Sequence, residues 1–482
     1  MELKQVAVLG GGPGGLFAAR LLKLHQPGCR VVVYERSEPE RTFGFGVGLQ
    51  TATQHNLRRA DPELLDAILA RALPHEMSMS IGDETVAMPI RDLIAIGRGT
   101  LLEVLRDQAV RAGVELRYGQ QVSAGDVLAD LVIAADGVNS ATRESRADQF
   151  GATIDWHNSL YLWCGADFAL HRALFRPETT EHGAFVAHAY PYAPDRSTFL
   201  IETDAETWSR AGFDRSGEQV VSGGNDEVAL DYLSQTFAGT LRGRRLIGNQ
   251  TRWLRFRTVR CERWHAGNVV LLGDAAATAH YSIGSGTKLA METAIALVAA
   301  LDDADDLATA LSSFDAARRP AVEHLQAVAT RSMLWWDDFP NRLHLPLEQL
   351  LLGYMTRAGK VSLDGFADTA PAVLRRGLAQ YAGVAESEVP SANLTDWVLS
   401  RPLFSGARSW PTRTVQAGAL AGAGLAVVDA TRSWEEALSA FEASEKKRWE
   451  GDLVGARISS DHRALAAAAL ASGRVDLIEI DE

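Results

Sequence analysis

The chain has 482 residues, of which 46% are hydrophobic and 23% charged, a composition typical of a globular protein with room for two or three domains. Its formal net charge of −13 argues against nucleic acid or an anionic membrane as a partner, because both require clustered lysine and arginine. Three widely spaced cysteines predict neither a disulfide framework nor a metal site. Because this cysteine pattern is typical of a reducing compartment, we expect a cytoplasmic protein. No apolar run is long enough to span a membrane.

The first forty residues have the pattern of a strand–helix–strand unit. The segment "VAVLG" at 6–10 predicts a buried strand, a helical pattern follows over about 14–24, and "CRVVVYER" at 29–36 predicts a second buried strand. Two buried strands joined by a helix indicate a parallel sheet.

A glycine-rich turn, "GGGPGG" at 10–15, lies between the first strand and the helix and fits the G-x-G-x-x-G pattern. Gly10 permits the tight turn, Gly12 lets a pyrophosphate approach the backbone, and Gly15 allows close packing of helix on strand. Glu35 follows Gly15 by 20 residues, where a carboxylate can accept from ribose hydroxyls. The turn predicts a dinucleotide site but does not separate NAD from FAD; the alternative is a glycine-rich turn without a ligand.

The next elements continue the sheet. "MSMSIGDETVAMPI" at 77–90 predicts a hairpin around Gly82 and Asp83, residues 100–112 a helix, and "VELRYGQQV" at 114–122 a strand. Another buried strand at 129–137 leads into "DGVNSATR" at 136–143, of the form D-G-x-x-S-x-x-R.

Residues 155–260 alternate in polarity and are rich in aromatics, which predicts a mostly antiparallel sheet. Buried-strand character returns at 267–276, before "GDAAATAHYSIGSG" at 273–286 and a long helix. Asp274 can bind a ribitol hydroxyl, and Gly284 and Gly286 begin a helix whose N–H groups can face the flavin N1/O2 edge. Each segment alone can be an ordinary strand-to-helix turn, but the three in this order favour FAD.

The remainder of the chain is helical over 304–382, and its last hundred residues have a strand–helix–strand–helix–strand pattern. We therefore predict an α/β protein. Its expected parts are a discontinuous FAD-binding domain at 1–150 with 262–345, an antiparallel sheet domain at 151–261, a helical segment at 346–383 and an α/β extension at 384–482.

These motifs resemble the single-component FAD-dependent aromatic hydroxylases, the p-hydroxybenzoate hydroxylase-like class. The resemblance implies a Rossmann-like FAD domain and reduced nicotinamide, NADH or NADPH, as co-substrate without a second nucleotide domain. Within the class, "ERSEPERTFGFGVGLQ", "HYSIGSGTKLAME" and "YMTRAGKVSLDGF" are similar to salicylyl-CoA 5-hydroxylases and 2-aminobenzoyl-CoA monooxygenases. "HAYPY" and "STFLIET" also resemble the violacein-pathway indole hydroxylase.

The resemblance implies electrophilic hydroxylation of an activated ring by a flavin C4a-hydroperoxide formed with O₂. The expected substrate is a small aromatic molecule, as a CoA or carrier-protein thioester. One alternative is an indole or other fused heteroaromatic in natural-product biosynthesis. Another is a flavin-binding redox protein without turnover, because Ala277 stands where the class has histidine. The last hundred residues resemble early strands of an ene-reductase barrel but are too few to close one, and an unrelated α/β cap is the alternative.

The same reasoning assigns residues to the site. His280 and Ser282 are candidate catalytic residues, with a structural histidine bonded to backbone as the alternative for His280. Candidate substrate contacts are Phe45, Trp163, His188 and Tyr190, with Arg255 and Arg257 for thioester phosphates beside Arg242, Arg244 and Arg245. The resemblance adds Arg98 and Val122 to the cofactor contacts. The full cofactor set is Gly10, Gly12, Pro13, Gly15, Leu16, Glu35, Arg36, Val47, Arg98, Val122, Asp136, Gly137, Gly273, Asp274, Gly284, Gly286, Thr287 and Lys288. No metal is predicted, and the oligomeric state stays open.

Overall fold

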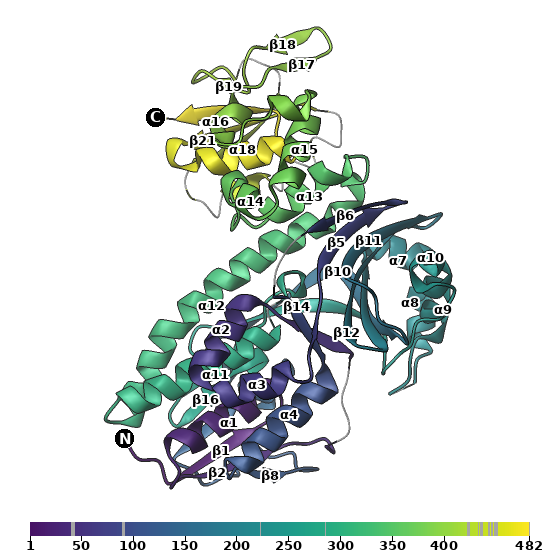
Figure 1. The fold of residues 1–482 in the computed structure, drawn as a ribbon. Coiled ribbons are helices and arrows are strands. Elements are labelled where there is room, and N and C mark those ends of the chain that lie inside the picture. The colour runs from purple at the N-terminus through teal and green to yellow at the C-terminus, as the bar shows by residue number, and fades with distance from the viewer. Residues whose placement is uncertain are drawn as a thin grey trace. The chain divides into compact units, whose positions relative to one another are not determined.

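A computed structural model describes residues 1–39, 44–88, 92–221, 223–284, 286–421, 425–431, 433, 437–441, 444, 447 and 452–481 (Figure 1). The chain forms two compact units. Unit 1 comprises Met1–Glu76 and Arg91–Gln326, and unit 2 comprises Met77–Ile90 and Ala327–Glu482. These units are coarser than the four parts predicted from the sequence, whose boundaries stay a prediction.

Unit 1 contains a six-stranded sheet in which all neighbouring strands are parallel except β15 and β16. The central residues of apolar strands such as "QVAVL" and "RVVVY" are buried, as expected when helices cover a parallel sheet. In order the strands are β15 (His265–Ala266), β16 (Val269–Leu271), β9 (Leu131–Ala134), β1 (Gln5–Leu9), β2 (Arg30–Tyr34) and β8 (Glu115–Arg117). Strand β8 ends earlier than predicted, because Gly119 adopts φ +66° and turns the chain.

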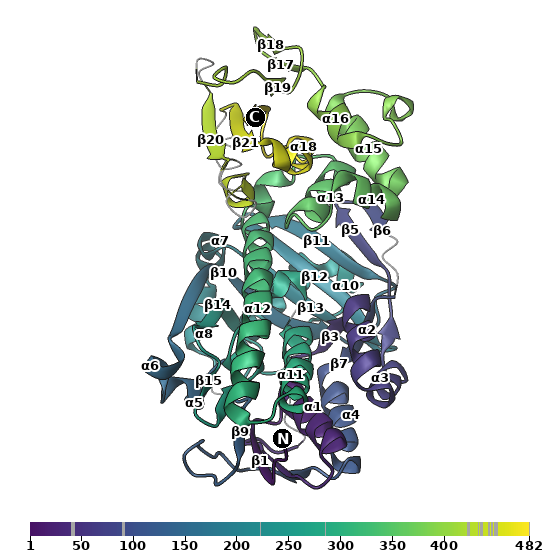
Figure 2. The ribbon, with the colours of Figure 1, turned by 90° about the vertical axis from the view of Figure 1, so that its left-hand side faces the viewer.

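Helices with apolar faces pack against this sheet. Helix α1 (Pro13–His25) connects β1 to β2, and α4 (Arg98–Arg111) precedes β8. Helix α11 (Gly286–Asp303) packs on α1, and Figure 2 shows α11 alongside the first part of α12 (Leu307–Asp337). The short elements around them are β3 (Gly46–Leu49), β4 (Leu73–Pro74), β7 (Ile94–Gly97), α2 (Thr51–Ala60), α3 (Pro62–Leu69), α5 (Ala141–Glu144) and α6 (Ala147–Phe150).

The second sheet of unit 1 is antiparallel, as the alternating sequence predicts. Its strands in order are β14 (Trp253–Cys261), β10 (Ala152–Ala166), β13 (Arg196–Thr203), β12 (Gly183–Ala193) and β11 (Ala173–Thr180). One face packs Leu162, Ala187 and Phe199 against the helices α7 (Ala205–Arg210), α8 (Phe213–Glu218), α9 (Glu227–Thr236) and α10 (Ala238–Leu241) (Figure 1). Because side chains alternate along a strand, Trp163, His188 and Glu202 belong to the opposite face.

Unit 2 contains the predicted hairpin, β5 (Met77–Ile81) and β6 (Glu84–Met88), and a helical part. The helices are the end of α12, α13 (Leu347–Thr356), α14 (Leu363–Thr369), α15 (Pro371–Ala382) and α16 (Leu394–Leu399). A small hairpin follows, formed by β17 (Leu403–Ser405) and β18 (Arg408–Trp410).

The last part of unit 2 is a parallel sheet in the order β19 (Thr414–Val415), β22 (Leu477–Asp481), β21 (Val454–Ser459) and β20 (Ala426–Ala430). The alanine-rich helix α18 (Arg463–Ala471) follows β21 and precedes β22 in the chain, and most of its residues are buried. These strands confirm the predicted alternation, while much of the helix expected up to residue 447 lies outside the described residues. Within the described chain, no helix combines the length and apolar character that crossing a membrane requires.

Candidate active site

The glycine turn before α1 has the geometry that its sequence predicts. Gly10 adopts φ +108°, and a Cβ there would lie 2.2 Å from the Ala135 carbonyl oxygen. A Cβ on Gly15 would lie 2.1 Å from the Gly10 carbonyl oxygen, so this position requires glycine for packing. In contrast, a Cβ on Gly12 would meet nothing within 4 Å. The helix N-terminus at Gly12 is therefore open to an anion.

Glu35 closes this turn from the end of β2. Its carboxylate oxygens accept hydrogen bonds from the Gly11 and Ser37 N–H groups, both at 2.8 Å. Of the neighbouring predicted contacts, Arg36 is exposed and Pro13 half-buried, whereas Leu16 lies in the core and donates its N–H to the Gly12 carbonyl. The side chain of Leu16 thus serves packing.

The D-G-x-x-S-x-x-R motif at 136–143 holds the turn after β9 against the turn after β16. Ser140 caps α5, and Oδ2 of Asp136 accepts from the N–H and hydroxyl groups of Thr142. Arg143, only 1% exposed, donates to the carbonyls of Val138 at 2.7 Å and Ala275 at 3.1 Å. Arg143 was not predicted as a site residue, although it is the last position of the D-G-x-x-S-x-x-R pattern. It ties the turn after β9 to the turn after β16.

Asp274 lies in that turn, in the 3₁₀ segment η1 (Gly273–Ala275). Its side chain has an exposed surface, but the protein around it removes part of its hydration and thereby raises its pKa. The positive charge of Arg98 opposes this increase. Burial lowers the pKa of Arg98, and Asp274 opposes that decrease. The Arg98 guanidinium carbon lies 5.9 Å from the ring centroid of Trp163. A carboxylate and a guanidinium thus face one region from different elements.

The residues present fit FAD. Gly12 leaves the start of α1 open, and Gly286 leaves the start of α11 open in the same way, with nothing within 4 Å of an added Cβ. Oδ1 of Asp136 is buried and has no hydrogen-bond partner among the residues that the structure describes. An open helix N-terminus can bind phosphate, and a carboxylate oxygen can accept a hydrogen bond from a polyol hydroxyl.

The other predicted cofactor contacts surround these groups. Gly137, Gly273 and Gly284 take left-handed conformations with φ between +63° and +82°. Val47 and Val122 are half-buried, as are Thr287 and Lys288 in the first turn of α11. These assignments stay predictions.

His280 is buried before the 3₁₀ turn η2 (Tyr281–Ile283), with 4% of its surface exposed. Its Nδ1 accepts a hydrogen bond from the Ser282 N–H at 3.3 Å. A bond of this kind to the backbone is expected if His280 is a structural residue. Burial lowers the pKa of His280 to about 3, and the charge of Glu202 only partly opposes this decrease. The imidazole is therefore neutral, and a catalytic role for His280 and Ser282 stays a prediction.

Phe45 and Tyr190 hold the segment 44–46 against the antiparallel sheet. The Tyr190 hydroxyl donates to the Gly46 carbonyl at 2.7 Å, and burial raises the pKa of Tyr190 to about 12. Phe45 is buried, and a Cβ on Gly165 would lie 2.4 Å from its ring. Both side chains make intramolecular contacts, so their predicted role in substrate binding needs a further test.

Glu202, which the sequence analysis did not single out, accepts hydrogen bonds from His188 Nε2 at 2.8 Å and from the Tyr281 hydroxyl at 2.6 Å. The signal for it was a single acid within the apolar strand "STFLIET". Trp163 lies on the same sheet face, and its buried indole N–H has no hydrogen-bond partner within the described ranges.

The predicted basic patch divides into two kinds of arginine. Arg244 pairs with Asp167 at 3.2 Å, and Arg245 pairs with Asp231. Arg255 donates to the carbonyl of Asn158 at 3.2 Å, and Arg257 donates to the side-chain oxygen of Asn139. Among the residues that the structure describes, Arg244 and Arg245 each have a carboxylate partner, whereas Arg255 and Arg257 are bonded to neutral groups alone.

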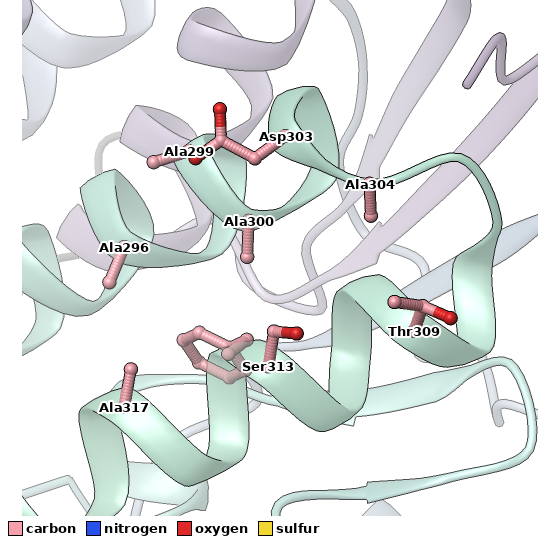
Figure 3. A pocket seen from close by; sticks show the side chains of 9 residues that line it. Ala296, Ala299, Ala300, Asp303, Ala304, Thr309, Ser313 and Ala317 are labelled. Atoms are coloured by element: carbon pink, nitrogen blue, oxygen red, sulfur yellow. The ribbon is translucent and has the colours of Figure 1, made fainter.

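A pocket between α11 and the first part of α12 lies apart from these residues (Figure 3). Small side chains line most of it, together with Phe314 and Asp303. None of the predicted site residues is among them, so we assign it no role in the site.

Comparisons with known proteins agree with this geometry. The model of the family described as "FAD binding domain" matches residues 4–329. The chain is 40% identical over 339 residues to salicyloyl-CoA 5-hydroxylase of a Streptomyces species, covering 70% of this chain and 66% of that protein. It is 41% identical over 360 residues to 3-hydroxy-4-methyl-anthranilyl-[aryl-carrier protein] 5-monooxygenase of Streptosporangium sibiricum, covering 74% and 95%. Protodeoxyviolaceinate monooxygenase of Chromobacterium violaceum is 30% identical over 370 residues, covering 73% and 94%.

Solved structures show the same fold. 2-Methyl-3-hydroxypyridine-5-carboxylic acid oxygenase aligns with a TM-score of 0.57 at 18% identity, covering 78% of this chain and 97% of that one. Pseudomonas aeruginosa PqsL in complex with 2-aminobenzoylacetate aligns with a TM-score of 0.53 at 22% identity, covering 70% and 97%. The predicted α/β fold, FAD cofactor and NAD(P)H-using class are confirmed. The chain belongs to the FAD-binding monooxygenase family and is an FAD-dependent aromatic monooxygenase.

Proposed function

We propose that this enzyme hydroxylates the aromatic ring of an aryl-CoA thioester. The observation that carries the proposal is the pair Arg255 and Arg257 beside the exposed ring of Trp156. FAD, when bound, carries the electrons of NAD(P)H and activates O₂ for insertion into the ring. The residues of the chain bind the thioester, orient its ring and exclude water.

Arg255 and Arg257 keep their positive charge available on strand β14. Their bonded partners are a carbonyl and an amide oxygen, whereas Arg244 and Arg245 are neutralised by carboxylates. In a protein of net charge −13, a basic pair without a carboxylate partner among the described residues favours an anionic ligand. The phosphates of coenzyme A are such a ligand.

Trp156 adds a surface for a planar base. It pairs with Arg257 across β10 and β14, and the Arg257 guanidinium carbon lies 5.1 Å from its ring centroid. Its side chain is 60% exposed, which is unusual for tryptophan in a strand. An exposed aromatic ring beside arginine supports stacking of adenine next to bound phosphate.

Aromatic side chains on the sheet face of Trp163 and Glu202 support positioning of the substrate ring. His157 follows Trp156 in β10, so its side chain points to the other face of the strand. It bonds to Thr258, and its ring lies 6.1 Å from that of His280. The rings of Phe256 and Tyr161 lie 5.9 and 4.8 Å from that of Tyr281. Such a cluster excludes water, as hydroxylation requires.

A carrier-protein thioester is the second candidate, because the Streptosporangium relative is named for a carrier-bound anthranilyl substrate. A phosphopantetheine arm has one phosphodiester and no adenine. The exposed Trp156 favours the CoA form, since only CoA offers a base to stack on it.

The proposal predicts different effects on different forms of one substrate. Trp156→Ala and the double variant Arg255→Ala/Arg257→Ala each raise KM for 2-aminobenzoyl-CoA about tenfold or more, the loss of roughly one good contact. Neither changes KM for the free acid, and Trp156→Ala does not affect a pantetheine thioester. Arg244→Ala, which removes an arginine already paired to a carboxylate, is the matched control. An equal rise for acid and thioester, or turnover of indolic rings alone, would contradict the proposal.

A further inference from the structure

Three segments of unit 1 meet at one buried carboxylate. Glu202 on β13 accepts from His188 Nε2 on β12 at 2.8 Å and from the hydroxyl of Tyr281 in η2 at 2.6 Å. The strand register pairs Glu202 with Val186 and His188 with Leu200, so Glu202 and His188 are diagonal neighbours on one sheet face. The contact to Tyr281 joins positions 79 residues apart.

Glu202 is ionised in this arrangement. It is 6% exposed, and burial alone would raise its pKa. The charge of His188 and the hydrogen bonds from His188 and Tyr281 outweigh burial and hold the pKa of Glu202 below its usual range. An ionised carboxylate only accepts hydrogen bonds.

The ionised carboxylate fixes the direction of the hydrogen bond at Tyr281. A phenol has one proton, and that of Tyr281 is directed to Oε2 of Glu202. Any further hydrogen bond at the Tyr281 oxygen is therefore one that it accepts. The ring is held by Tyr161 at 4.8 Å and by His280 at 4.0 Å between centroids. The residue precedes Gly284 and α11, where the cofactor contacts are predicted.

We propose that Tyr281, oriented by Glu202, accepts a hydrogen bond from a proton-donating substituent of the substrate ring, an amino or hydroxyl group. This inference rests on the proposed function and specifies the ring. Tyr281 contacts the substituent, whereas Glu202 and His188 are positioning residues that act through it. Accepting this hydrogen bond also leaves more electron density on the ring, which favours electrophilic attack.

The test uses two thioesters with FAD-loaded enzyme, and equilibrium dissociation constants from calorimetry are the readout. 2-Aminobenzoyl-CoA offers a donor and is a poor acceptor, while 2-methoxybenzoyl-CoA offers only acceptors. The native enzyme binds the amino compound at least about tenfold more tightly, because a site built for a donor rejects a ligand without one.

Glu202→Gln reverses this preference. The amide oxygen faces the His188 donor, so the amide N–H₂ faces Tyr281, whose proton is released toward the substrate. Binding of the amino compound then weakens about tenfold and binding of the methoxy compound tightens. Tyr281→Phe abolishes the difference. The control is Glu178→Gln, which changes an acid paired with Arg176 at 2.6 Å on β11 and leaves the preference unchanged.

Two results would overturn the inference: equal binding of both thioesters by the native enzyme, or equal weakening of both by Glu202→Gln. In either case both thioesters bind, so the proposed function survives. If neither thioester binds but the free acids do, the proposed function fails. The same comparison with 2-aminobenzoate and 2-methoxybenzoate then decides the role of Tyr281.

Discussion

The charge states of two buried residues in this enzyme are set by the groups that surround them. His280 is a histidine that does not carry a charge at neutral pH, since burial lowers its pKa to about 3 and its Nδ1 accepts from a backbone N–H. Glu202 is a buried acid that stays charged, because two donors hold it. Burial thus decides the charge state of His280, whereas hydrogen-bond partners and the charge of His188 outweigh burial at Glu202.

His280 makes stability depend on pH. Its pKa is lower in the folded chain than in the unfolded chain, so the unfolded state binds the additional proton and stability decreases as pH falls from about 6.5 toward 3. Between pH 7 and pH 5 the loss from this group is about 2 kcal/mol. His280→Asn removes that part of the loss in urea unfolding at the two pH values. His324→Gln, at an exposed position of α12, serves as control, and an unchanged pH dependence in His280→Asn would contradict the assignment.

At the scale of elements, the same residue type serves two purposes in the turn before α1. Gly15 is needed for packing, since a Cβ there would lie 2.1 Å from the Gly10 carbonyl oxygen. Gly12 has open space above it and is needed only if a phosphate approaches. The start of α11 at Gly286 is open in the same way.

This difference separates folding from cofactor binding. Gly12→Ala leaves the thermal midpoint of the FAD-free protein nearly unchanged and reduces FAD affinity at least about tenfold, because its Cβ occupies the approach of the pyrophosphate. Gly15→Ala destabilises the fold itself by about 3 kcal/mol or more, in the range of severe core overpacking. Flavin absorbance and far-UV circular dichroism measure the two effects. Gly28→Ala, also without neighbours within 4 Å of its Cβ, keeps both properties. An unchanged FAD affinity in Gly12→Ala would refute the proposed pyrophosphate site at the start of α1.

At the scale of the whole molecule, all predicted FAD contacts lie in unit 1, whereas the C-terminal parallel sheet lies in unit 2. The match to the FAD-binding family spans residues 4–329 and so extends over nearly all of unit 1. Where two units of a chain unfold independently, a ligand stabilises only the unit that binds it.

Calorimetry of the full chain is therefore expected to show two unfolding transitions. FAD at a hundred times its Kd stabilises one of them by about 2.7 kcal/mol and leaves the other in place. The transition that FAD does not shift belongs to unit 2. A single transition that moves as a whole on addition of FAD would show that the two units unfold together.

The sequence by itself determined the cofactor and the order of elements. Glycine turns, buried apolar strands and alternating strands are local patterns, because φ angles and side-chain periodicity depend on a few neighbouring residues. The strand expected over 114–122 extends too far for a local reason as well, the left-handed turn at Gly119.

Only the tertiary structure decided which polar groups are compensated. Arg244 is paired with Asp167 from 77 positions away, whereas Arg255 meets a backbone carbonyl, although the sequence presents both as one basic patch. Glu202 acquires its role from Tyr281, at 79 positions' distance. Pairing of charges and hydrogen bonds depends on distances of a few ångströms between remote segments, and no local pattern encodes those distances.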